Sequence, residues 1–170
     1  MTKIFAHRGA SAYAPENTME AFHLAAKQGA DGIELDVHVT KDGEVVVTHD
    51  EKIDRVSNGS GFVKDMTLRE LKRLSFHNHM ESYVGAGIPT LREVLEFVKT
   101  TTMAVNIELK TGLYWYPNIE EKTVALVHEL GMQDRIIYSS FNHHSIAKLK
   151  EIDSCCRDRM ASFSDVNFKC

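Results

Sequence analysis

Short segments of alternating apolar and polar residues are separated by longer segments in which apolar residues recur every three to four positions. The first pattern is typical of strands and the second of amphipathic helices. Strands are predicted over residues 3–7, 32–39, 103–110 and 135–140, with a last and weaker candidate over residues 160–168. Because helical segments alternate with these strands, the pattern predicts an α/β fold with a parallel sheet.

The predicted helices begin at capping signals. Helices are expected from about Asn17, Thr67, Thr90, Pro117 and Asn142. Thr67 and Thr90 each lie three residues before a glutamate, which is the spacing of a capping box. Asn17 and Asn142 suit the N-cap position because their side chains accept hydrogen bonds from the first free backbone N–H groups. The first two strands are therefore joined through a helix and are expected to pair in parallel.

Two features follow the strand over residues 32–39. A turn at residues 41–43 is followed by an apolar run, which brings the chain back to His49 and Asp50. Residues 51–88 are rich in Gly, Ser and Asn and hold one short predicted helix. Segments this long without regular structure are usually functional loops or small insertions, so an insertion after the second strand is predicted here.

The composition is that of an ordinary globular protein. A chain of 170 residues can bury one core, so residues 1–170 are predicted to form a single domain. The net charge is −4 and the basic residues are scattered, which argues against nucleic acid as a partner. No apolar run is long enough to span a membrane, and the first apolar run leaves no room for a signal peptide, so a cytoplasmic protein is expected. Cys155, Cys156 and Cys170 are expected to be free thiols.

Acidic residues and a histidine are placed at the ends of the predicted strands. Glu34 and Asp36 are two residues apart, so both side chains point to the same face of their strand. A carboxylate pair among apolar neighbours is costly without a positive partner, and a metal ion is the simplest such partner. His7 and Glu108 lie at the ends of two further strands. The carboxyl ends of parallel strands meet on one face of an α/β fold, so these four residues are expected to converge there.

The order of these residues resembles that of a known family. The motifs, in sequence order, are His7-Arg8-Gly9, Glu16-Asn17-Thr18, Glu34-x-Asp36, His49-Asp50 and Glu108-x-Lys110. Each motif alone is common, but their ordered combination strongly resembles the glycerophosphodiester phosphodiesterase family. The resemblance implies a TIM (β/α)8-barrel fold, and it runs from about residue 4 into the helix after Asn142.

The resemblance also implies roles for individual residues. Glu34, Asp36 and Glu108 correspond to carboxylates that hold a divalent cation. Three carboxylates without cysteine favour Mg²⁺ or Ca²⁺ over zinc. His7 and His49 correspond to a general acid and base pair, and either order of the two roles remains open.

The implied reaction is hydrolysis of a small-molecule glycerophosphodiester to sn-glycerol 3-phosphate and an alcohol. By analogy with the family, the 2-hydroxyl of the glycerol attacks phosphorus first and water then opens a cyclic phosphate. Arg8 and Lys110 suit the phosphate oxygens, where charge develops in the transition state.

The length of the chain leaves alternatives open. A complete barrel has eight βα units and about 250 residues. Only four strands and one weaker candidate are predicted, so the chain is expected to be truncated at its C-terminal side, with the first half to five-eighths of a barrel. Open strand edges favour self-association. The alternatives are an active enzyme completed by a second copy or a longer chain, a catalytically impaired member that retains metal and phosphate binding, and a related phospholipase D-like sphingomyelinase.

Neighbouring residues have simpler expected roles. Asp50 is expected to hydrogen-bond His49, and His38 is expected to lie exposed beside the turn. Trp115 and Tyr116 are expected either to line the pocket or to pack against the next helix.

Overall fold

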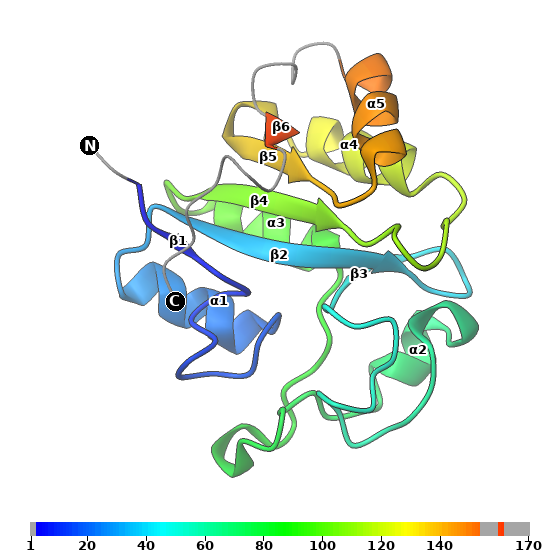
Figure 1. Cartoon of the computed structure of the whole chain (residues 1–170). Helices are drawn as coiled ribbons and strands as arrows, with labels where there is room; N and C mark the ends of the chain where they lie inside the picture. The colour runs from blue at the N-terminus through cyan, green and yellow to red at the C-terminus, as the bar shows by residue number, and fades with distance from the viewer. Residues whose placement is uncertain (1–2, 154–159, 162–170) are drawn as a thin grey trace.

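The computed structural model describes residues 3–153 and 160–161 (Figure 1). Within these residues, five strands pair in parallel in the order β1-β2-β4-β5-β6, and β3 pairs antiparallel to β2. The strands are β1 Phe5–Ala6, β2 Gly32–Val39, β3 Val45–Val47, β4 Ala104–Leu109, β5 Ile136–Ser139 and β6 Met160–Ala161. The predicted strands are therefore confirmed up to β5. Of the weaker candidate, residues 162–168 lie outside the described residues, as do the three cysteines.

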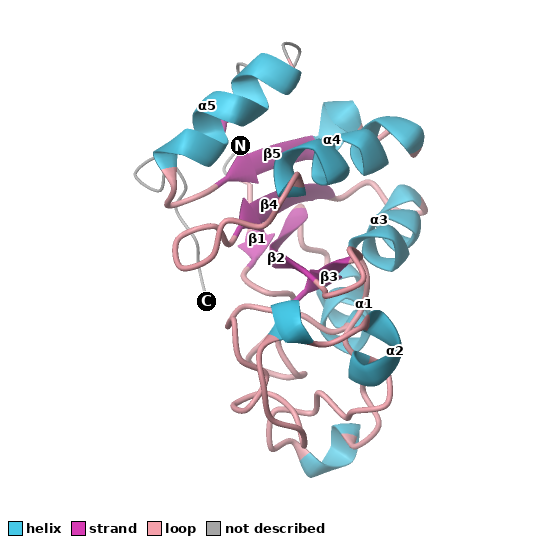
Figure 2. Ribbon diagram, turned by 90° about the vertical axis from the view of Figure 1, so that its right-hand side faces the viewer, coloured by secondary structure: helices cyan, strands magenta, loops and turns pink. Residues whose placement is uncertain are grey.

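Helices follow the parallel strands in turn. They are α1 Met19–Lys27, α2 Leu68–Leu71, α3 Leu91–Lys99, α4 Ile119–Glu129 and α5 His143–Ile152. The strand order in the sheet repeats the order along the chain, and α1, α3 and α4 lie on one side of the strands (Figure 2). A doubly wound sheet would reverse its strand order and carry helices on both faces. The predicted barrel-type fold is therefore confirmed, as a partial (β/α)8 barrel.

The main core lies between the helices and one face of the sheet. Ile33, Leu35 and Val37 of β2 are fully buried there together with apolar residues of β4 and of the helices. Burial of each such side chain contributes about 1.5–3 kcal/mol. Because side chains alternate along a strand, this packing directs Glu34 and Asp36 to the opposite face. The core thus decides which face carries the acidic residues.

Three of the predicted helix starts are confirmed in detail. Asn142 is the N-cap of α5, and its side chain accepts a hydrogen bond from the backbone N–H of His144. Thr67 and Thr90 are the N-caps of α2 and α3, and each forms a complete capping box with the glutamate three residues later. The prediction for α1 was wrong by one residue. Its N-cap is Thr18, whose hydroxyl accepts a hydrogen bond from the backbone N–H of Ala21, while Asn17 has a left-handed φ of 56°. The side chain of Asn17 is therefore free for another role.

The segment after β3 has a small apolar cluster of its own. The segment contains α2 and two short 3₁₀ turns, η1 Val63–Asp65 and η2 Glu81–Tyr83. The cluster consists of Val46, Ile53, Val56, Val63, Leu71, Phe76 and Ile88. Val46 belongs to β3, so the cluster fastens the segment to the hairpin of β2 and β3. That residues 51–88 are an insertion within one domain of residues 1–170 stays a prediction. Among the helices of the described residues, none has the length and apolar character needed to cross a membrane.

The outer edge of β1 leads to a prediction of self-association. Among the described strands, β1 pairs only with β2, and a groove of about 330 Å³ follows it, lined by residues that include Ile4 and Tyr13. Both side chains are largely exposed. We expect the chain to self-associate through this edge and Ile4→Lys to raise the dissociation constant at least about tenfold, which is about 1.4 kcal/mol. Sedimentation velocity measures this.

Val84 is also a largely exposed apolar residue but lies in the segment after β3, so Val84→Lys is the matched control. A wild-type chain that stays monomeric at the highest concentrations, or an equal effect of both substitutions, contradicts association through β1.

Candidate active site

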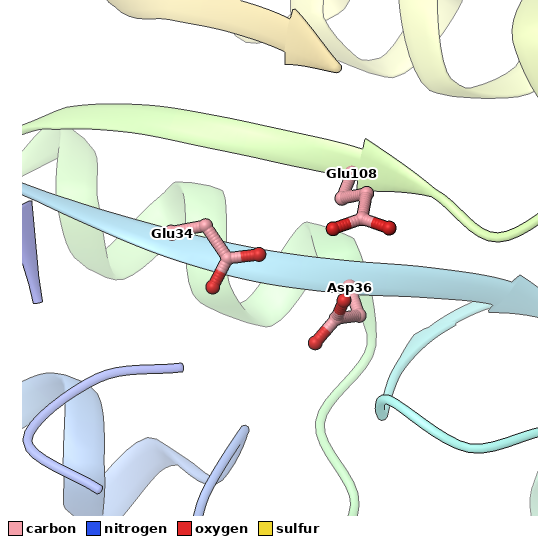
Figure 3. A group of neighbouring side chains, drawn as sticks. All are labelled: Glu34, Asp36 and Glu108. Carbon is pink, nitrogen blue, oxygen red and sulfur yellow. The ribbon is translucent and has the colours of Figure 1, made fainter. Parts of the chain in front are cut away.

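Three carboxylates meet on the inner face of β2 and β4. Glu34 and Asp36 lie on β2, and the register of the sheet places Glu108 of β4 opposite Asp36. All three are buried, and one oxygen from each lies within 4.8 Å of the others (Figure 3). The structure therefore brings together the three residues that the sequence suggested as ligands.

Burial sets the charge state of this cluster. Burial, together with the neighbouring charge of Asp36, raises the pKa of Glu34 to about 8. Burial likewise raises the pKa of Glu108. Lys110 lies between two of the carboxylates, with Nζ 3.0 Å from Asp36 Oδ1 and 2.7 Å from Glu108 Oε1. Burial favours the neutral amine, but the two carboxylates outweigh it and raise the pKa of Lys110. Burial and the repulsion from Asp36 therefore both oppose the charged forms of Glu34 and Glu108.

The three carboxylates fit a hard divalent cation. All the donor atoms are carboxylate oxygens, which Mg²⁺ and Ca²⁺ prefer, and no thiolate is present among them. Their separation is that of ligands on one ion rather than of independent surface charges. Since the raised pKa of Glu34 comes partly from Asp36, a cation between them would stabilise both charged forms. Glu34, Asp36 and Glu108 are the residues that would hold it.

The end of β1 approaches the cluster through an unusual backbone conformation. Arg8 and Gly9 have left-handed φ values of 56° and 78°. A Cβ on Gly9 would lie 2.8 Å from Ala21 of α1, so only glycine fits there. This turn directs the backbone N–H of Arg8 to Glu34 Oε2, to which it donates a hydrogen bond of 3.0 Å. A non-glycine residue held in this conformation is typical of a functional site.

The side chains of His7 and Arg8 also reach the cluster. His7 Nε2 is 3.9 Å from Glu34 Oε2, and Arg8 Nε is 3.4 Å from Asp36 Oδ2. Burial and the charge of Arg8 lower the pKa of His7, so its ring is neutral at neutral pH. A neutral imidazole is able to accept a proton.

His49 follows β3 and lies near the same group. Its Nδ1 donates to Asp50 Oδ1 at 2.6 Å, so the predicted hydrogen bond is confirmed. The charge of His49 contributes to the lowered pKa of His7 and acts on the pKa of Glu108. His7 therefore lies beside Glu34, and His49 is near enough for its charge to act on His7 and Glu108.

The prediction that His38 is exposed was wrong. His38 is fully buried, with Nε2 3.0 Å from the carbonyl oxygen of His49 and Nδ1 2.8 Å from the hydroxyl of Tyr116. Burial lowers the pKa of His38, which keeps the ring neutral. A carbonyl oxygen only accepts, so Nε2 donates to it and Nδ1 accepts from the tyrosine. His38 thus links Tyr116 to the backbone of His49.

Asn17 is a site residue that sequence reasoning missed. It is buried, and its Nδ2 donates a hydrogen bond of 2.9 Å to Asp36 Oδ2. Asp36 therefore receives contacts from Asn17, Arg8 and Lys110. Of the two aromatic residues left open, Tyr116 is buried against His38 while Trp115 is largely exposed. The alternation of side chains along β2 could have indicated His38, whereas the contact of Asn17 with Asp36 has no signal in the sequence beyond the Glu16-Asn17-Thr18 motif.

Comparison with known proteins identifies the family. The family model described as "Glycerophosphoryl diester phosphodiesterase family" matches residues 7–162. The chain belongs to the glycerophosphoryl diester phosphodiesterase family. A relative named glycerophosphodiester phosphodiesterase from Caldanaerobacter subterraneus subsp. tengcongensis is 50% identical over 152 residues, which are 89% of this chain and 63% of the relative. One of the same name from Bacillus altitudinis is 51% identical over 149 residues, 86% of this chain and 61% of the relative.

Solved structures of the glycerophosphoryl diester phosphodiesterase family share the fold. The glycerophosphodiester phosphodiesterase from Agrobacterium tumefaciens matches with a TM-score of 0.81 at 42% identity, covering 89% of this chain and 63% of the other. A phosphodiesterase from Oleispira antarctica, solved with its product sn-glycerol-3-phosphate, matches with a TM-score of 0.78 at 32% identity, covering 95% and 65%. The chain thus spans somewhat less than two thirds of the length of these relatives.

Cation binding by the cluster is testable by thermal unfolding. We expect Mg²⁺ or Ca²⁺ at 100 times its dissociation constant to stabilise the chain by about 2.7 kcal/mol, which raises Tm by roughly 5–11 °C. Glu34→Gln should abolish this rise because it removes one ligand charge. Glu96→Gln, on the exposed side of α3, should leave it intact. An equal rise in the Glu34→Gln chain would place the bound ion elsewhere.

The contact between Tyr116 and His38 is testable by urea denaturation. Tyr116→Phe leaves the buried Nδ1 of His38 without its donor, so we expect the free energy of unfolding to fall by about 1–3 kcal/mol. Tyr83→Phe is the control, because its hydroxyl bonds the exposed carbonyl of Tyr13. The control should change the free energy by less than about 0.5 kcal/mol. Equal effects of the two substitutions would contradict a buried, satisfied His38.

Proposed function

We propose that the chain catalyses cation-dependent hydrolysis of glycerophosphodiesters to sn-glycerol 3-phosphate and an alcohol. The names of the relatives and the product bound to the Oleispira antarctica phosphodiesterase support this reaction class. The single observation that supports it most is the buried cluster of Glu34, Asp36 and Glu108 beside two histidines. Burying three carboxylates this close together is costly unless a cation or hydrogen-bond donors compensate their charge.

His7 and His49 act as the acid and base pair in this proposal. One imidazole accepts the proton of the attacking hydroxyl while the other protonates the oxygen of the leaving alcohol. The neutral ring of His7 and the hydrogen bond from His49 Nδ1 to Asp50 are consistent with such roles. With Nδ1 of His49 committed to Asp50, proton transfer takes place at its Nε2.

Arg8 and Lys110 bind the phosphate. Arg8 Nε is buried without a hydrogen-bond partner, and its 3.4 Å approach to Asp36 is a long ion pair. A phosphate oxygen would satisfy this donor. Lys110 Nζ already bridges Asp36 and Glu108, so it lies where a phosphate bound above these carboxylates needs neutralising.

A divalent cation held by the three carboxylates would supply Lewis-acid and orienting chemistry for the phosphate and glycerol oxygens. Asn17 and the backbone N–H of Arg8 hold Asp36 and Glu34 in place for it. Hydrogen bonds of this kind to metal ligands keep them in a productive orientation.

A cytoplasmic location of the protein also stays a prediction of the sequence.

The proposal is tested by release of glycerol 3-phosphate from glycerophosphocholine with Mg²⁺ or Ca²⁺. We expect His49→Gln and Glu34→Gln to lower kcat/KM by about 10²–10⁴-fold, because each removes a group that acts in the transition state. His143→Gln is the control, since His143 is exposed at the start of α5. Activity that survives both site substitutions would overturn the assignment.

Two other outcomes distinguish the alternatives. Binding of cation and of glycerol 3-phosphate without turnover identifies a catalytically impaired member of the family. Preferential cleavage of sphingomyelin or lysophosphatidylcholine over glycerophosphocholine identifies the phospholipase D-like substrate class.

A further inference from the structure

Arg55 joins two loops of the site through its guanidinium group. Its Nε donates to Asp50 Oδ2 at 2.7 Å. Its Nη1 and Nη2 donate to the two carboxylate oxygens of Glu16 at 3.0 and 2.7 Å. Glu16 lies in the loop after β1, Asp50 follows β3, and Arg55 belongs to the segment of residues 51–88. One side chain therefore ties together three stretches of the chain.

Each of the two carboxylates holds a residue of the candidate active site. Asp50 Oδ1 accepts the hydrogen bond from His49 Nδ1 at 2.6 Å. Glu16 Oε1 accepts one from Arg8 Nη1 at 3.1 Å. The contacts form a continuous chain from His49 through Asp50, Arg55 and Glu16 to Arg8, in which every step is 3.1 Å or shorter.

We propose that Arg55 is a positioning residue that orients His49 through Asp50 and Arg8 through Glu16. The roles of His49 and Arg8 in proton transfer and phosphate binding rest on the proposed function, whereas the orientation of their side chains does not. Arg55 does not touch the substrate in this proposal. It acts only through the two carboxylates.

The geometry of the guanidinium group explains why arginine suits this place. Nε, Nη1 and Nη2 all donate to carboxylates, so a phosphate would have to displace Asp50 or Glu16 to bind. Arg8 differs, because its buried Nε has no hydrogen-bond partner. The planar fork of arginine spans two carboxylates at fixed angles, which the single ammonium group of lysine does not.

Both oxygens of Asp50 are used, one by His49 and one by Arg55. The plane of the carboxylate is thereby fixed, and so is the ring that donates to it. A carboxylate only accepts, so Nδ1 of His49 carries a proton and a neutral ring keeps its free electron pair on Nε2. Burial favours the neutral acid, but the hydrogen bonds from Arg55 and His49 outweigh it and lower the pKa of Asp50. Asp50 therefore stays charged at neutral pH and accepts the hydrogen bond from Nδ1 of His49.

The chain of residues 1–170 with Arg55→Gln tests the proposal by NMR of the imidazole nitrogens. Protonated and unprotonated ring nitrogens resonate far apart, and His49→Gln identifies the signals of His49. In the wild-type chain we expect Nδ1 of His49 to be the protonated nitrogen. In the Arg55→Gln chain we expect this signal to shift toward an average over both tautomers. We also expect kcat/KM for glycerophosphocholine to fall by about 10–100-fold.

Arg92→Gln is the matched control. Arg92 forms the same forked contact with Glu129, at 2.8 and 2.7 Å, and its side chain is 45% exposed compared with 44% for Arg55. Glu129 contacts no residue of the candidate active site, so this variant should leave both the His49 signals and kcat/KM unchanged. Unchanged His49 signals in folded Arg55→Gln overturn the proposal.

Arg55→Lys serves as the second variant and as the substitute if Arg55→Gln loses its folded circular dichroism spectrum. We expect lysine to restore at most part of the wild-type His49 signal, since it reaches one carboxylate at a time. Full restoration contradicts a role for the fork. If the wild-type chain has no hydrolytic activity but Arg55→Gln shifts the His49 signal, the proposed function is contradicted and the positioning role is supported. If the wild-type chain hydrolyses glycerophosphocholine but Arg55→Gln leaves the His49 signal unshifted, the positioning role is contradicted and the proposed function is supported.

Discussion

The concentration of negative charge on the inner face of the sheet is the constraint that organises the site. Three buried carboxylates within 4.8 Å repel one another, and a buried charge without a partner is strongly destabilising. Donor groups from different elements compensate the charge of Asp36, which is contacted by Asn17, Arg8 and Lys110. The loop after β1 and the end of β4 are therefore shaped by the need to compensate residues of β2.

Side chains of alternating charge extend from the carboxylate cluster toward the surface. Arg8 is held by Glu16, Glu16 by Arg55, and Arg55 by Asp50, which receives His49. Each charge has an opposite one at hydrogen-bond distance, so no member is left isolated as the network passes from the buried cluster to the half-exposed Arg55. This arrangement links the geometry of His49 to that of Arg8, although the two residues belong to different loops.

Local rules predicted the scaffold and the carboxylates well. Alternation along β2 fixed the face of Glu34 and Asp36, and parallel pairing brought Glu108 opposite Asp36. The errors arose where a distant residue decides the outcome. His38 shares the face of Asp36, but its burial depends on Tyr116, which is 78 residues away in the sequence. Sequence patterns do not encode such contacts.

Asn17 shows the same limit at short range. Asparagine is a common N-cap residue, but Asn17 has a left-handed φ and Thr18 is the N-cap instead. The side-chain amide of Asn17 donates to Asp36. The three carboxylates themselves need only the register between β2 and β4, where a slip of one residue would move Glu108 to the helical face. Because these two strands are neighbours within the sheet, the cation site depends on their pairing and not on how the outer edge of β1 is covered.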